Sequence, residues 1–206
     1  MSRLEYGLLF IKITLIEIKM AAYYYLISSL PMLDLDSPVK LDSSAFIELC
    51  RDFLPENELE IISSLKIEPN ETSTNISELE AWKNWETQLR NSLVKYRGKE
   101  ANINVNDYLR EERDYSSEIE KGVVDAYSKS NPLEREDHLD KVRWSKLEGM
   151  EVGHDFDFLK LCLYKLKLLI CEKRNKYNLE KGSQDFDEVI AHIYEQDSME
   201  PLQIED

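Results

Sequence analysis

The sequence predicts an all-α protein, an irregular bundle of about six to eight helices, and three observations lead to this class. From Leu41 onward, the apolar residues recur almost throughout at helical spacing. Gly and Pro number only 6 each in 206 residues, which argues against a turn-rich β fold. Hydrophobic residues make up 42% and charged residues 33%, a balance that can bury a core.

The chain is expected to form a single helical domain over residues 20–195, with a loop near 66–75 and an acidic, flexible tail over 196–206. Residues 1–19 fit neither a signal peptide nor a membrane span. Their apolar run is interrupted by Lys12 and Glu17, and no small-residue cleavage site follows it. We expect translation to start naturally at Met20, which would make residues 1–19 a non-native or mis-annotated extension.

The stretch "MAAYYYLISSLP" begins this domain and allows two conformations. As a helix ending near Pro31, it would place Tyr23, Ile27 and Leu30 on one face. As a short strand over residues 22–29, it would place Tyr23, Tyr25 and Ile27 on one face. Aromatic and β-branched residues favour the strand, so the residues alone leave both open.

Capping residues divide the rest of the domain into helices. The expected helix starts are, in chain order, Asp42 to Ser44, Pro55, Asn75 with Glu78 at N3, about Val105, and Asn131 with Pro132 at the first position. Gly98 is the expected C-cap of the helix that starts at Asn75, and the helix from about Val105 should end at "SKSNP". Gly153 breaks the pattern again, and Asp155 and Asp157 offer caps for the next helix.

That next helix, "FDFLKLCLYKLKLLICEKRNKY", is the most apolar in the chain and carries two apolar lines. The first line is a heptad-like seam of Phe156, Leu159, Leu163, Leu166 and Ile170, and the second line contains Leu161, Tyr164 and Leu168. A helix with two apolar lines has neighbours on two sides, so we expect it at the centre of the bundle. "QDFDEVIAHIY" should form a last short helix.

The net charge of −15 makes nucleic acids and anionic membranes poor partners. It suits either simple solubility or docking to a basic protein surface. Residues 160–181 differ, with seven basic residues against Glu172 and Glu180. Lys160, Lys167 and Arg174 are spaced by seven, beside the apolar seam. They either match an acidic neighbouring helix, such as the one with "EREDHLD", or form a docking face for an acidic partner.

No pattern in the chain predicts catalysis or a cofactor. Phosphate-cradling glycine loops are absent from the sequence. The three cysteines form no CxxC pair and suit buried positions in a reducing compartment. The alternative is a metal-dependent helical-bundle enzyme using Glu151, His154 and His138. Its weakness is that bundle di-iron sites need two ExxH motifs, and this chain has one.

Four segments together resemble a known family: "MAAYYYLISSLPML", "LDSSAFIELC", "NPLEREDHLDKVRW" and "FDFLKLCLYKLKLLICEKRNKYNLEKGSQDF". The chain is identified as a member of an uncharacterised bacterial family encoded among the subunits of V/A-type ATP synthases. More weakly, it is similar to the all-helical AC39-like protein that seats the central stalk of these enzymes on the membrane ring. This chain is shorter than a full three-lobed AC39-like protein, so only part of that architecture can be present.

The resemblance begins at Met20 and favours the helical form of the tyrosine stretch. It implies a non-catalytic accessory or central-stalk component of a proton- or sodium-translocating ATPase, acting through protein–protein contacts. The implied partners are the central stalk and the membrane ring, and the implied location is cytoplasmic and peripheral to the membrane. A transient assembly factor of the same ATPase is the other alternative.

The contacts are expected on the N-terminal tyrosines and on "NPLEREDHLDKVRW". The candidate interface residues are Tyr23, Tyr24, Tyr25, Asn131, Pro132, Glu134, Arg143 and Trp144. Tyrosine, arginine and tryptophan are the residue types enriched at interface hot spots. For Arg143 and Trp144, the competing interpretation is an ion pair and core packing inside the bundle.

Overall fold

The computed structural model describes residues 19–69, 74–113 and 116–176. Its helices are residues 19–29, α2 (Ser43–Arg51), α3 (Glu56–Ser64), α4 (Ser77–Ala101), the short 3-10 helix η1 (Asn106–Tyr108), α5 (Ser117–Tyr127), α6 (Pro132–Glu151) and α7 (Phe158–Asn175). The described residues contain no strand, which confirms the all-α prediction. None of their helices is long and apolar enough to cross a membrane. Residues 1–18, the predicted helix "QDFDEVIAHIY" and the tail from 196 lie outside the described residues.

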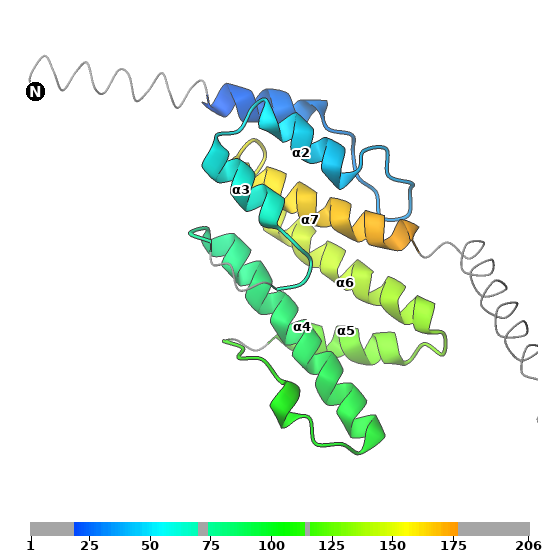
Figure 1. The fold of residues 1–206 in the computed structure, drawn as a ribbon. Helices are drawn as coiled ribbons and strands as arrows, with labels where there is room; N and C mark the ends of the chain where they lie inside the picture. Colours follow the sequence, from blue (N-terminus) through cyan, green and yellow to red (C-terminus); the bar gives the residue numbers. More distant parts are fainter. Residues whose placement is uncertain (1–18, 70–73, 114–115, 177–206) are drawn as a thin grey trace, which may run out of the picture.

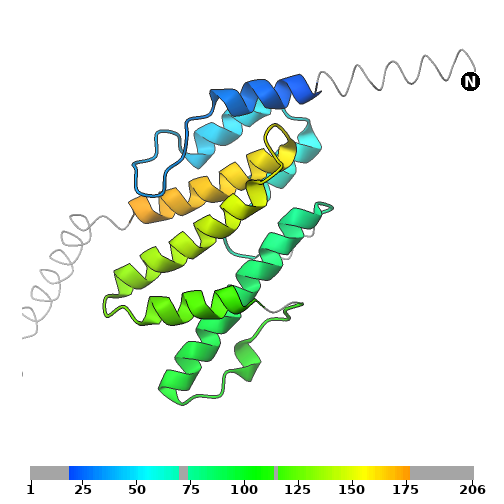
Figure 2. The ribbon, with the colours of Figure 1, turned by 180° about the vertical axis from the view of Figure 1, so that it is seen from behind.

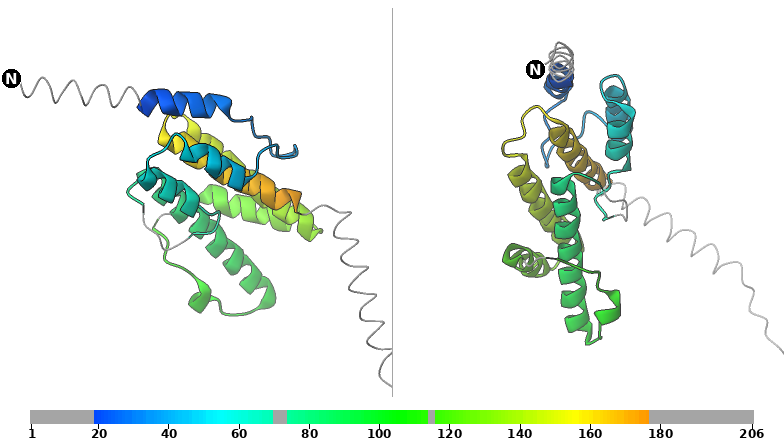
Figure 3. Two further views of the ribbon diagram at one scale, coloured as in Figure 1. Left: turned by 45° about the horizontal axis from the view of Figure 1, so that its top comes forward. Right: turned by 90° about the vertical axis from the view of Figure 1, so that its left-hand side faces the viewer.

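Helix α7 lies in the middle of the molecule, as its two apolar lines predict. It contacts α2 and α3 as well as α6. Figure 1 shows the helix of residues 19–29, α2 and α3 above α7, and α6, α5 and α4 below it. The view from behind shows the helix of residues 19–29, α7 and α6 one below the other (Figure 2). Two further views place α2 and α3 on one side of α7 and residues 19–29 on another (Figure 3).

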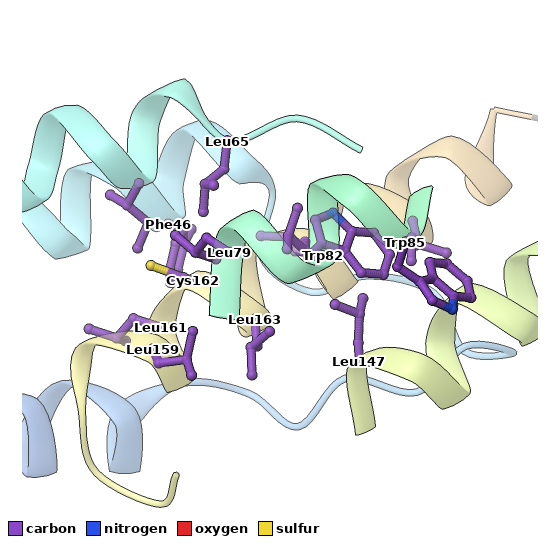
Figure 4. Close-up of a cluster of buried hydrophobic side chains, with 14 of the residues drawn as sticks. Phe46, Leu65, Leu79, Trp82, Trp85, Leu147, Leu159, Leu161, Cys162 and Leu163 are labelled. Carbon is purple, nitrogen blue, oxygen red and sulfur yellow. The ribbon is translucent and has the colours of Figure 1, made fainter. Parts of the chain in front are cut away.

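The hydrophobic core runs continuously through these helices. Figure 4 shows Trp82 and Trp85 of α4 near Leu147 of α6 and the first turns of α7. The two indole rings stack with centroids 5.4 Å apart. From the apolar lines of α7, Leu161, Leu163, Leu166, Leu168 and Ile170 are fully buried. Burying each such side chain contributes roughly 1.5–3 kcal/mol, so this helix supplies a large share of the core.

Three predicted N-caps are confirmed by side-chain hydrogen bonds. Asp42 accepts from the amide of Ala45 at 2.7 Å, and Asn131 accepts from that of Leu133 at 2.9 Å. Asp157 caps α7 by accepting from the amide of Lys160 at 2.9 Å. The helix α7 therefore begins after Phe156, so that this phenylalanine lies outside the seam to which it was assigned.

The predicted ends of α4 are wrong at both termini. Its N-cap is Ile76, without a side-chain hydrogen bond, and Asn75 is exposed. Glu80 instead holds the backbone that leads into the helix, because its carboxylate accepts from the amide of Thr74 at 2.7 Å. At the other end, α4 continues past Gly98 to Ala101, and Asn102 takes the left-handed conformation, with φ of 54°.

The predicted helix from about Val105 to Tyr127 is also wrong in its first half. Only the short η1 forms there, and α5 begins at Ser117. The intervening backbone is paired to α4, because Asn91 exchanges two hydrogen bonds with Arg110, at 2.8 and 3.0 Å. The amide of Arg113 donates to Asn84 at 3.0 Å. These side chains satisfy backbone groups that a helix would otherwise pair internally.

Candidate functional site

The N-terminal tyrosines lie on a helix, so the helical alternative for "MAAYYYLISSLP" is confirmed. Tyr23 and Leu26 are buried, and Ile27 and Leu30 pack against the core from the same face. The Tyr23 hydroxyl donates to Glu58 Oε2 at 2.7 Å, and Lys19 donates to the other oxygen of this carboxylate. Burial, together with the hydrogen bond and charge of Glu58, raises the pKa of Tyr23 well above its usual value.

Tyr24 and Tyr25 point away from the core and are 58% and 65% exposed. A neighbouring aromatic ring flanks each of them. Phe156, on the loop between α6 and α7, lies with its ring centroid 4.7 Å from that of Tyr24. Phe53, just after α2, lies 5.6 Å from Tyr25. We call these four residues with Met20, which is also exposed, the aromatic surface. It consists of two ring pairs, Tyr24 with Phe156 and Tyr25 with Phe53, on adjacent positions of one helix, and it includes three segments that are far apart in the sequence.

The second group of predicted interface residues lies at the opposite end of α6. Asn131, Pro132 and Glu134 are grouped at its first turn, with Asn131 serving as the N-cap. The helix α6 is 20 residues long, about 30 Å at 1.5 Å per residue. The aromatic surface adjoins its C-terminal end through Phe156. The predicted interface residues therefore belong to two separate surfaces and not to one.

Arg143 lies between these two surfaces, inside the bundle. It is 4% exposed, and it donates from Nε and Nη2 to the two oxygens of Glu86, each at 3.0 Å. A third bond, from Nη1 to Asp140, is also 3.0 Å. Burial by itself lowers the pKa of Arg143, but the charge and hydrogen bonds of Glu86 and the charge of Asp140 raise it overall. The structure thus supports the competing interpretation of Arg143 as an internal ion pair, because no surface remains for a partner.

Trp144 is half-buried beside the basic face of α7. Its indole nitrogen donates to Glu148 at 2.9 Å, and Lys167 Nζ lies 4.8 Å from its ring centroid. With Tyr23 also buried, the exposed candidates are Tyr24, Tyr25 and the first-turn residues of α6.

The basic residues of α7 face acidic groups of this chain, which favours the internal interpretation of the heptad-spaced charges. Lys173 bridges Glu136 and Asp140, at 3.0 and 2.8 Å. Lys160 and Lys167 both approach Glu151, at 3.1 and 2.9 Å. In the same way, Arg174 pairs with Asp36 and Asp137. The "EREDHLD" segment therefore pairs with Lys173 and Arg174 at the C-terminal end of α7, whereas Lys160 and Lys167 pair with Glu151 at the end of α6.

The donors of the metal-enzyme alternative are engaged separately. Glu151 accepts from the two lysines, and His154 Nδ1 lies 2.6 Å from Asp157, while His138 faces the groove between α5 and α6. In the described part of the chain, no three His, Cys, Asp or Glu residues are grouped to hold a metal ion.

The three thiols are free and buried. Burial raises the pKa of Cys50 to about 12 and that of Cys171 to about 11. For Cys162, burial raises the pKa even further. Because the thiolate is the reactive species, these cysteines suit packing and not nucleophilic chemistry.

Comparison with known proteins gives a family and no function. Residues 70–197, more than half of the 206, match the family model described as "Protein of unknown function (DUF2764)". The chain belongs to the DUF2764 family. No curated protein matches it, and no solved structure matches it.

The DUF2764 match covers α4 to α7, with the ion pairs of Arg143, and it does not include the helix of residues 19–29. The aromatic surface therefore combines Phe156, inside the matched range, with tyrosines outside it. Sequence reasoning missed Phe156 by assigning it to the apolar seam. Its position directly before the cap Asp157 was the signal that it falls outside the helix.

Proposed function

We propose that this DUF2764 protein is a non-catalytic accessory or central-stalk component of a V/A-type ATPase, acting through protein–protein contacts. The observation that carries the contact function is the exposed aromatic surface of Tyr24, Tyr25 and Phe156. Exposed aromatic rings that are already fixed against each other bind partners with little loss of side-chain entropy. The identity of the partner comes from the sequence resemblance to proteins encoded with these ATPases.

The exposed area of the aromatic surface is smaller than the area that a stable protein–protein interface buries. A fully buried aromatic side chain removes about 150–250 Å² from water. With exposed fractions of 58%, 65% and 43%, Tyr24, Tyr25 and Phe156 together offer roughly 250–400 Å². A standard interface buries about 800 Å² per partner. The rings are therefore the proposed hot spot of a larger contact, which also takes in Met20 and neighbouring polar residues.

In this proposal the protein lies on the cytoplasmic side of the membrane and associates with it through the ATPase. Its partners are the central stalk and the membrane ring. The charge of −15 favours contact with basic protein surfaces over anionic lipid.

The test is a pull-down of the tagged full chain from native membranes, with the eluate identified by mass spectrometry. ATPase subunits should co-elute with the unmodified chain. The double variant Tyr24→Ala/Tyr25→Ala should lower their yield at least about ten-fold, equivalent to about 1.4 kcal/mol. Tyr108→Ala is the matched control, since Tyr108 is 72% exposed but lies on η1, outside the aromatic surface.

An eluate of the unmodified chain without ATPase subunits overturns the proposal. Equal losses for the double variant and for Tyr108→Ala would instead remove the aromatic surface from it. The ratio of this chain to ATPase subunits then separates the two roles. A fixed ratio indicates a permanent subunit, and a small, growth-dependent ratio indicates a transient assembly factor.

A further inference from the structure

Arg97 and Arg135 differ from the other arginines of the helices. Arg51, Arg90, Arg143 and Arg174 each pair with a carboxylate of this chain. Among the described residues, neither Arg97 nor Arg135 has a carboxylate in ion-pair range, although the chain carries 41 acidic side chains. Two such arginines that meet on an acidic protein therefore need an explanation.

Both arginines are held by one tyrosine. Arg97 comes from the end of α4, Tyr127 is the last residue of α5, and Arg135 lies in the first turns of α6. Residues from these three helix ends line one pocket. The guanidinium carbons of Arg97 and Arg135 lie 5.9 and 5.1 Å from the Tyr127 ring centroid, which is cation–π range.

Each arginine donates a hydrogen bond from Nε, and its two Nη nitrogens remain available. Arg97 Nε donates to the Tyr127 hydroxyl, and Arg135 Nε donates to the backbone oxygen of Lys129 at 2.8 Å. The Tyr127 ring is itself packed against that of Tyr96, with centroids 4.4 Å apart. The terminal nitrogens of both arginines have no partner in the described residues. They are the pair of donors that binds a carboxylate in a forked geometry.

Arg97, Arg135 and Tyr127 line a pocket of about 540 Å³. Ala101, Pro132 and Leu139 supply its apolar walls, next to the Tyr127 ring. This mixture of two guanidinium groups and an apolar wall suits a carboxylate carried on a side chain better than a bare ion. We refer to it as the arginine pocket.

The charges around the arginine pocket select a monoanion. Glu100 and Glu136 also line it. Glu136 is bonded to Lys173, and the charges of Lys173, Arg143 and Arg97 offset the effect of burial and hold its pKa below the usual value. Burial, followed by the charge and hydrogen bond of Glu100, raises the pKa of Tyr96, so that Glu100 also has a partner. Within the lining, the two arginines and the two glutamates cancel, so the pocket offers guanidinium donors without an excess of positive charge, which suits a singly charged carboxylate better than a phosphate dianion.

We infer that the arginine pocket binds a carboxylate from an acidic segment of a partner protein, with an adjacent apolar side chain of that segment against Ala101 and Pro132. This inference does not depend on which protein the aromatic surface contacts, because the two surfaces lie at opposite ends of α6. Either one can fail while the other stands.

The experiment observes the arginine Nε–H signals of the isotope-labelled full chain by NMR at about 0.15 M salt, where distant acidic groups are screened. The probe is the capped peptide acetyl-Leu-Glu-Leu-amide, and acetyl-Leu-Gln-Leu-amide is its uncharged control. The Arg97 and Arg135 signals should shift saturably with the Glu peptide, with a dissociation constant of about 1 mM, and at least about five-fold more weakly with the Gln peptide.

The variant Arg135→Gln should weaken binding of the Glu peptide about five- to ten-fold, because it removes one charged donor pair. Arg51→Gln changes the net charge equally and should leave binding unchanged, since Arg51 lies on α2 and pairs with Glu48. Where Arg135→Gln lowers the melting temperature too far, Arg135→Lys serves instead. It keeps the charge and loses the forked geometry, and should weaken binding by about three-fold.

Three outcomes overturn the inference. The first is the absence of saturable shifts up to about 20 mM Glu peptide, well above the expected constant. The second is equal binding of the Gln peptide, or an equal effect of Arg51→Gln, which would indicate general electrostatic attraction. The third is tighter binding of inorganic phosphate than of the Glu peptide, which would assign the pocket to a phosphate ligand.

Discussion

Replacing Arg143 by methionine tests the buried charge cluster that joins α4, α6 and α7. Methionine keeps much of the volume and removes the charge. The substitution leaves the fully buried Glu86 with one cation among the described residues, Arg90. The Arg90 side chain is 34% exposed. Removing one partner of a buried pair costs about 3–5 kcal/mol, because the other charge stays in an apolar environment without compensation.

The measurement is urea unfolding followed by tryptophan fluorescence, which reports on the stacked Trp82 and Trp85 at the core. In a thermal scan followed by the same signal, the melting temperature should fall by about 6–20 °C, at roughly 2–4 °C per kcal/mol for a chain of this length. The double variant Glu86→Gln/Arg143→Met should be at least about 1 kcal/mol more stable than Arg143→Met, because it no longer buries an uncompensated carboxylate.

The matched control is Arg51→Met, which breaks the exposed pair between Arg51 and Glu48. Those side chains are 60% and 67% exposed, so the loss should be at most about 0.5 kcal/mol. A cost below about 1 kcal/mol for Arg143→Met would refute the reasoning, since it would mean that water or a rearranged cation reaches Glu86. A double variant whose cost equals the sum of the two single costs would refute the coupling.

Two further predictions concern packing and pH. Gly98→Ala should destabilise the fold despite the better helix propensity of alanine, because the added methyl group would overlap Val105 Cγ1. At Gly149 the added methyl group meets nothing within 4 Å, so Gly149→Ala should stabilise the fold by about 0.5–1 kcal/mol. Thermal melts of the two variants test both expectations. The raised pKa values of Cys50 and Cys171, about 12 and 11, predict that their contribution to stability is complete below the unfolded value of about 8.5 and is lost as pH rises toward the folded values. Urea midpoints should therefore decrease from pH 8 to pH 10, and less steeply in Cys50→Ala.

The sequence correctly predicted the helix starts at which a side chain caps an amide only two or three residues away. Asp42, Asn131 and Asp157 cap within three residues of themselves, so that their residue type and position were sufficient. The region after α4 failed because its conformation is decided at a distance. The backbone of Arg110 pairs with Asn91, 19 residues earlier, and no periodicity in either segment reports that contact.

The same distinction applies to the candidate surfaces. The prediction that the tyrosines near residue 24 contribute to a surface needed only helical spacing, once the helix was assumed. The same spacing places Tyr23 on the face of Ile27 and Leu30, but the hydrogen bond of Tyr23 to Glu58, 35 residues away, has no signal in the sequence. The arginine pocket could not be predicted, since Arg97 and Arg135 are far apart in the sequence and meet only because the ends of α4, α5 and α6 line one pocket.

The position of Arg143 connects the two proposed surfaces physically. The helix α6 carries the arginine pocket at its first turns and adjoins the aromatic surface beyond its last turn, about 30 Å away. Between them, Arg143 and Asp140 tie α6 to Glu86 of α4 and Lys173 of α7. These ion pairs join α4, α6 and α7 into one body, and α5 packs against both α4 and α6. A body of this kind, with separate contact surfaces at its two ends, suits a protein that holds two partners at a fixed separation.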